Sequence, residues 1–155
     1  MTLTTATKES LYTREMLDIG LKRLPNNAKV SADYELGPQF SAQKAKDNQV
    51  ETYWTSGTPT ATGNFKIIFE NDPQQISLLR LKTGSFFTTE AVFNVTGYRK
   101  LGDPQSIDAG STSIRINSTV TTRPQTVDIY IKSDKYEVLE IQCIGVPTIN
   151  DIEFF

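Results

Sequence analysis

Histidine is absent from the 155-residue sequence, and cysteine occurs once, at Cys143. The absence of histidine excludes Ser-His-Asp triads, Cys-His dyads and zinc or haem sites with histidine ligands. A single cysteine excludes a disulfide within the chain. Because Cys143 lies in a strand-like segment, we expect a small buried core residue there rather than a reactive thiol.

A strong charge of one sign is also lacking. Sixteen basic residues against 18 acidic residues give a net charge of −2, whereas nucleic-acid-binding domains normally present a strongly basic face. No apolar run approaches the roughly 18 to 20 residues that span a bilayer. The N-terminus has no apolar segment typical of a signal peptide. We therefore expect synthesis in a cytoplasm, with no nucleic-acid or membrane partner.

Neutral polar and β-branched residues are abundant. Thr, Ser, Asn and Gln together number 47, and there are 13 Ile and 8 Val, a composition that favours strands. From residue 28 onward, short apolar segments alternate with Gly, Pro, Asn and Asp. Strands are expected at residues 29–33, 65–70, 75–82, 88–98, 112–117, 127–132, 136–144 and 149–155. So many strands without helical crossovers predict an all-β fold, an antiparallel β-sandwich or jelly roll.

Residues 1–27 are predicted to form an N-terminal arm, separate from a sandwich at residues 28–155. Apolar residues recur at roughly helical spacing between residues 7 and 24, and Pro25 ends the pattern. A helix is favoured, and the alternative is an extended arm that orders against a partner. The apolar stripe of the arm consists of Leu11, Met16, Ile19 and Leu24. Since a two-sheet sandwich needs no helix to complete its core, we expect this stripe to form an interface.

A ten-residue motif carries a resemblance to a known family. Residues 45–54 read Ala-Lys-Asp-Asn-Gln-Val-Glu-Thr-Tyr-Trp, which resembles the pattern Ala-x-Asp-Gly-Asn-x-x-Thr-x-Trp of discoidin domains, also called coagulation factor V/VIII C-type domains. Asn48 and Gln49 replace the usual Gly-Asn. The segment at residues 149–155 is similar to the family's closing strand. The resemblance covers residues 28–155 and implies a galactose-binding-like β-sandwich.

The resemblance also implies a calcium site. In the family, this loop often wraps a calcium ion with the Asp, the Thr, main-chain carbonyls and an acidic residue of the last strand. The matching positions here are Asp47, Thr52 and Asp151. Calcium takes about six to eight oxygen ligands, so carbonyls and water would have to complete the site. The alternative is that Asp47 and Thr52 cap local backbone amides. No other cofactor is implied.

Aromatic residues suggest both a core and a ligand site. Trp54 is expected to be buried beneath the loop from Asp47 to Thr52 rather than to serve as a ligand platform. Domains of this family bind sugars with variable loops at one end of the sandwich. Candidate sugar-binding residues are Phe86, Phe87, Tyr98 and Arg99, with Tyr34 and Phe40 as further aromatics. Ordinary core or interface packing is the alternative for each of them.

The sequence favours a non-enzymatic function, because no catalytic motif occurs together with the other motifs that the same enzyme family requires. Discoidin-like domains normally bind carbohydrates or surfaces outside cells, yet this sequence shows no export signal and has an arm. We therefore interpret the chain as a structural or adsorption subunit of a virus (phage) particle. Its partners would be other virion proteins or copies of itself, bound through the arm. The alternative is a stand-alone carbohydrate-binding module that recognises surface glycans, and a small hydrolase is a distant third.

Overall fold

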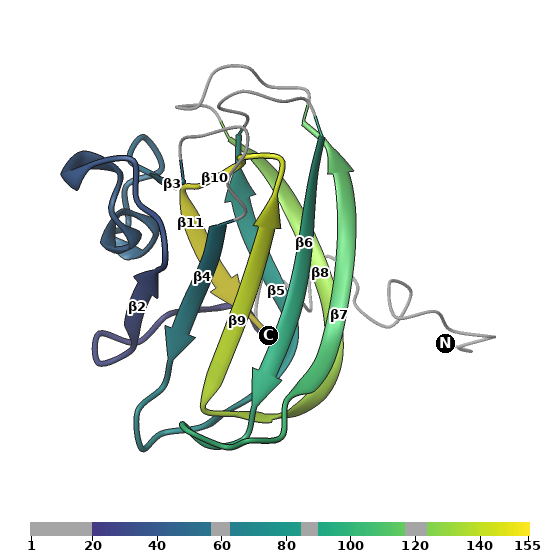
Figure 1. The fold of residues 1–155 in the computed structure, drawn as a ribbon. Coiled ribbons are helices and arrows are strands. Elements are labelled where there is room, and N and C mark those ends of the chain that lie inside the picture. Colours follow the sequence, from purple (N-terminus) through teal and green to yellow (C-terminus); the bar gives the residue numbers. More distant parts are fainter. Residues whose placement is uncertain (1–19, 57–62, 85–89, 117–123) are drawn as a thin grey trace.

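The computed structural model describes residues 20–56, 63–84, 90–116 and 124–155, and strands dominate these ranges (Figure 1). In chain order the elements are β1 (Lys22–Arg23), β2 (Lys29–Ala32), the 3-10 helices η1 (Pro38–Phe40) and η2 (Ala42–Lys46), β3 (Trp54–Thr55), β4 (Gly63–Ile68), β5 (Gln74–Thr83), β6 (Glu90–Tyr98), β7 (Ile107–Arg115), β8 (Gln125–Tyr136), β9 (Val138–Ile144), β10 (Thr148–Ile149) and β11 (Asp151–Phe154). Within the described ranges, no helix has the length and apolar character needed to cross a membrane.

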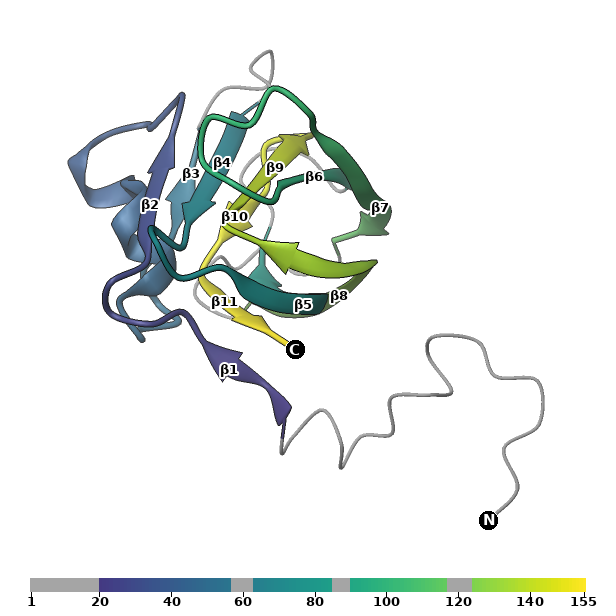
Figure 2. The ribbon, with the colours of Figure 1, turned by 90° about the horizontal axis from the view of Figure 1, so that it is seen from below.

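Two antiparallel sheets face each other across the core. One has the strand order β2-β4-β9-β6-β7 and the other β1-β11-β5-β8, and β10 pairs with β3 in a short separate ladder. Seen from below, the two sheets curve around a common interior (Figure 2). The predicted antiparallel β-sandwich is confirmed.

Alternation of side chains along the strands builds the core. In β4, Phe65 and Ile67 are fully buried, whereas Asn64 and Lys66 lie on the outer face. In β8, Ile129 and Ile131 point inward in the same way. Both sheets therefore contribute apolar side chains to the core, and the outer faces of the sheets can carry polar residues.

Trp54 lies at the centre of this packing. Its side chain is fully buried and packs edge-on against Phe65, with ring centroids 5.3 Å apart. Its indole Nε1 donates a hydrogen bond to the carbonyl oxygen of Tyr34 at 2.8 Å. The indole therefore has both apolar contacts and a partner for its one polar group. Its predicted burial is confirmed.

Cys143 is buried in β9, with its side chain in the core cluster. Burial raises the pKa of its thiol well above the usual range, because the charged thiolate would lose its hydration. We expect Cys143 to resist a disulfide reagent such as Ellman's reagent in the native protein and to react within minutes in denaturant. Reaction of the native protein at the rate of the denatured chain would contradict the burial.

The described part of the predicted arm differs from expectation. Residues 22 and 23 form β1, which pairs with β11, so this segment is a strand of the sandwich and not a helix. Leu24 is buried in the core cluster of its own chain and does not lie on an exposed stripe. The physical reason is that β1 satisfies backbone groups at the edge of β11 and directs Leu24 inward. Leu11, Met16 and Ile19 lie outside the described residues.

Candidate functional site

The outer face of the five-stranded sheet carries rows of polar residues in cross-strand register. In one row Lys66 of β4 lies opposite Glu140 of β9, which lies opposite Thr96 of β6. In the next row Asn64 lies opposite Gln142, which lies opposite Asn94. We call this surface the polar face, made up of Ser31, Asp33, Asn64, Lys66, Asn94, Thr96, Tyr98, Glu140 and Gln142.

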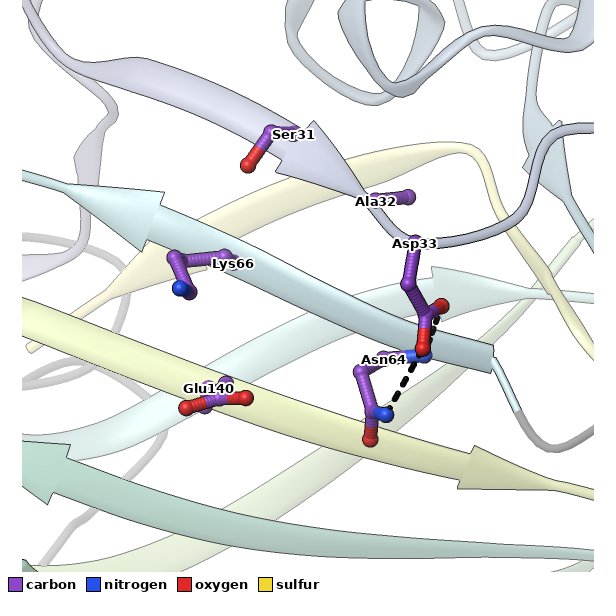
Figure 3. Close-up of a pocket in the computed structure, with 6 residues that line it drawn as sticks. All are labelled: Ser31, Ala32, Asp33, Asn64, Lys66 and Glu140. Atoms are coloured by element: carbon purple, nitrogen blue, oxygen red, sulfur yellow. Dashed lines mark hydrogen bonds between the residues drawn. The ribbon is translucent and has the colours of Figure 1, made fainter.

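Three shallow hollows adjoin one another on the polar face. Figure 3 shows the first, of about 250 Å³, which is lined by Ser31, Ala32, Asp33, Asn64, Lys66 and Glu140. The second, of about 210 Å³, extends across Gln142 and Asn94 to Tyr98. The third, of about 200 Å³, lies between Lys66, Tyr98 and the turn at Leu101. Glu140 lines all three, so it is the central residue of the surface.

Hydrogen bonds between neighbouring side chains fix the orientation of the amides. Asn64 donates from its backbone N and from Nδ2 to the two carboxylate oxygens of Asp33, both at 2.8 Å (Figure 3). Asn94 Nδ2 donates to Gln142 Oε1 at 2.9 Å. The Asn94 carbonyl oxygen and the Gln142 amide nitrogen thus remain to accept from and donate to a ligand. A preoriented surface of this kind loses less side-chain entropy on binding.

Tyr98 supplies an aromatic ring to the same surface. Burial of its phenol raises the pKa of Tyr98, and the nearby Glu140 carboxylate raises it further. The phenol therefore stays neutral at physiological pH. The ring lines a hollow together with Val138 and Leu101, which adds an apolar part to a mostly polar site. Such a mixture of apolar surface and placed polar groups is typical of small-ligand sites.

The other candidate sugar-binding residues that the structure describes do not join the polar face. Arg99 forms an ion pair with Asp134 of β8, with Nη2 2.7 Å from Oδ2. This hydrogen bond raises the pKa of Arg99 and lowers the pKa of Asp134. Phe40 packs against Tyr53, with ring centroids 5.4 Å apart, and Tyr34 is exposed. Phe86 and Phe87 lie outside the described residues.

The side chains of the predicted calcium site bond to protein groups. Asp47 accepts from the backbone N of Gln49 at 3.0 Å and from Oγ1 of Thr52 at 2.5 Å, as expected of a capped loop. Both oxygens of Asp151 accept from Nη1 of Arg23 at 3.1 Å. Burial raises the pKa of Asp151, and the Arg23 guanidinium offsets part of that increase.

The main-chain oxygens of the loop are engaged as well. The carbonyl oxygen of Gln49 accepts from the backbone N and the hydroxyl of Thr52, at 3.2 and 3.0 Å. The carbonyl oxygen of Val50 accepts from Nδ2 of Asn150 at 2.7 Å. Among the described residues, no group of three or more carboxylates, cysteines or histidines could hold a metal ion. This donor set does not fit a calcium ion, which needs several oxygens turned toward one point.

Comparison with known proteins shows the fold. Scans of the sequence against protein-family models and against curated proteins gave no match. Chitosan-binding module 1 of a chitosanase/glucanase from Paenibacillus sp. IK-5 is 14% identical, with a TM-score of 0.67 over 86% of this chain and 98% of that one. The family 32 carbohydrate-binding module of C. perfringens NanJ, solved in complex with galactose, is 15% identical, with a TM-score of 0.65 over 86% and 98%.

A third neighbour links these modules to the discoidin resemblance. The F5/8 type C domain of a Bacteroides fragilis protein is 13% identical, with a TM-score of 0.63 over 86% of this chain and 95% of that one. None of these three neighbours is a virus-particle protein, so the virion setting has no support from them. The chain has the galactose-binding-like sandwich fold of family 32 carbohydrate-binding modules and F5/8 type C domains.

Proposed function

We propose that this chain is a non-catalytic carbohydrate-binding domain and that its polar face holds the glycan. The observation that carries the proposal is the set of three adjoining hollows around Glu140, lined by preoriented amides, a lysine, carboxylates and a tyrosine. The fold adds support, because neighbours with this architecture are described as binding chitosan and galactose.

Sugar hydroxyls suit this surface because each one can both donate and accept a hydrogen bond. Lys66 and the Gln142 amide nitrogen can donate, while Glu140 and the Asn94 carbonyl oxygen can accept. Neighbouring positions lie about 5 Å apart across the strands and about 7 Å apart along them. Open hollows at this spacing suit a short oligosaccharide lying on the sheet better than a small molecule enclosed in a deep pocket.

The virion interpretation rests on sequence features that the described residues do not reinforce. Of the four stripe residues, only Leu24 is described, and it belongs to the core of its own chain. The carbohydrate-binding alternative is therefore the better supported of the two hypotheses.

Substitutions on the polar face should weaken glycan binding without unfolding the protein. We expect Asn94→Ala and Glu140→Gln each to raise the Kd for a bound glycan by about tenfold, the loss of roughly one hydrogen bond. Galactose and chitosan oligosaccharides are the first ligands to test, by isothermal titration calorimetry. Gln75→Ala, an exposed amide on the opposite sheet, should leave the Kd unchanged.

Two results would argue against this site. Unchanged affinity in both polar-face variants would exclude the polar face as the binding surface. If Phe86→Ala abolished binding in the same experiment, the sugar site would instead lie among the loops predicted from the sequence. If the wild-type protein bound neither galactose nor chitosan oligosaccharides, and also bound no glycan of a wider array, carbohydrate binding itself would be refuted.

A further inference from the structure

Arg23 connects three parts of the chain that are distant in sequence. It lies in β1, and its Nη1 donates to Oδ1 of Asn48 at 2.8 Å and to both carboxylate oxygens of Asp151 at 3.1 Å. The two hydrogens of Nη1 are therefore shared among three acceptors. The Asp151 side chain is only 5% exposed, whereas that of Arg23 is 52% exposed. The guanidinium thus closes over a buried carboxylate from the solvent side.

Backbone structure brings the partners of Arg23 to this position. Pairing of β1 with β11 places Arg23 opposite Glu153, two residues from Asp151. Asn48 has φ 62°, in the left-handed region that glycine and asparagine tolerate best. This is the position at which the discoidin pattern has glycine. Asn48 thus keeps the backbone turn and adds a side-chain oxygen, which faces Arg23.

Two further side chains hold the loop and the end of η2 that precedes it. Asn150, adjacent to β11, donates to the carbonyl oxygen of Val50. Lys46 donates from Nζ to the carbonyl oxygens of Asn26, at 3.3 Å, and Ala28. Protein hydrogen bonds therefore hold both the loop and the residue immediately before it.

We propose that the Arg23 guanidinium is a built-in cation that fastens the Asp47–Thr52 loop to β11 and makes this junction independent of calcium. A nearly buried carboxylate needs a cationic partner, and both oxygens of Asp151 already face Arg23. A calcium ion would have to displace the guanidinium and break the hydrogen bonds inside the loop. This role is separate from glycan binding on the polar face, so each can fail without the other.

Thermal unfolding of the whole chain tests the proposal. The wild-type protein should have the same Tm in millimolar calcium chloride and in excess EGTA, because no ion contributes binding energy to the folded state. Arg23→Met should lower the Tm by roughly 5 to 10 °C in both buffers, since it removes the guanidinium that pairs with the nearly buried Asp151 carboxylate. Lys22→Met, which removes a charge from the neighbouring exposed position in β1, is the matched control and should change the Tm little.

A double variant keeps the test decisive if Arg23→Met does not fold. Arg23→Met with Asp151→Asn removes the buried charge together with its partner, so it should recover part of the lost Tm. A wild-type Tm that rises with calcium would overturn the proposal. So would an Arg23→Met protein that melts like the wild type, or a double variant no more stable than the single one.

Discussion

Trp54→Ala is expected to lower the free energy of unfolding by about 3 to 5 kcal/mol, the usual cost of emptying a large aromatic site in a core. The indole is fully buried against Phe65, and its removal also leaves the Tyr34 carbonyl without its donor. Urea denaturation followed by tyrosine fluorescence or circular dichroism measures the difference.

Two control variants separate the effects of volume and hydrogen bonding at Trp54. Trp54→Phe retains much of the ring but loses the donor, so it should cost clearly less than Trp54→Ala. Tyr34→Ala removes an exposed ring and keeps the carbonyl that Trp54 binds, so its effect should stay near 0.5 kcal/mol or below. A Trp54→Ala protein with the wild-type urea midpoint would contradict the packing described above.

Gly97→Ala is expected to destabilise the fold by about 1 to 3 kcal/mol, because it inserts a methyl group into a filled space. A Cβ at this position in β6 would lie 2.2 and 2.4 Å from two carbons of the Tyr136 ring. That ring is fully buried, and its hydroxyl donates a hydrogen bond to the Lys132 carbonyl. The ring cannot move aside without losing its core packing and this hydrogen bond. The same urea experiment measures the loss.

The change in stability caused by a Gly→Ala substitution should depend on the space around the glycine. Gly37→Ala is the control, because a Cβ there would meet no atom closer than 3.7 Å and the backbone is extended. Its stability should stay equal to the wild type or rise slightly. Combining Gly97→Ala with Tyr136→Leu, which shortens the opposing side chain, should cost less than the sum of the two single changes. Strict additivity would show that the two side chains do not compete for space.

Alternation of apolar and polar residues was sufficient to predict most strands. It failed where residues typical of turns lie inside a long paired strand. The expected strands at residues 127–132 and 136–144 leave a gap at Ser133, Asp134 and Lys135, yet β8 continues through these residues to Tyr136. Asp134 and Lys135 pair with β5, and the Arg99 side chain binds Asp134. These tertiary contacts outweigh the local preference for a turn, and no local pattern reveals them.

The candidate site was less accessible to sequence reasoning than the fold. Tyr98 could be named as an aromatic candidate. Glu140 and Asn94, by contrast, look in the sequence like any polar residue on the outer side of a strand. Only the pairing of β4, β9 and β6 brings these positions together. Arg23 was missed for a related reason: a two-residue strand has no periodicity, and its ion pair with Asp151 spans most of the chain.

The strand order of the two sheets also has a consequence for folding during synthesis. β6 and β7 follow each other in the chain, but β4 must pair with β9, β5 with β8, and β1 with β11. Such distant pairings carry a loop-closure cost before any contact compensates for it, which typically slows folding to milliseconds or seconds. Because β11 lies between β1 and β5, the four-stranded sheet cannot close until Asp151–Phe154 has emerged from the ribosome. Until then β5 has an open edge, and a nascent chain at this stage depends on chaperones or on low concentration to avoid pairing with another copy.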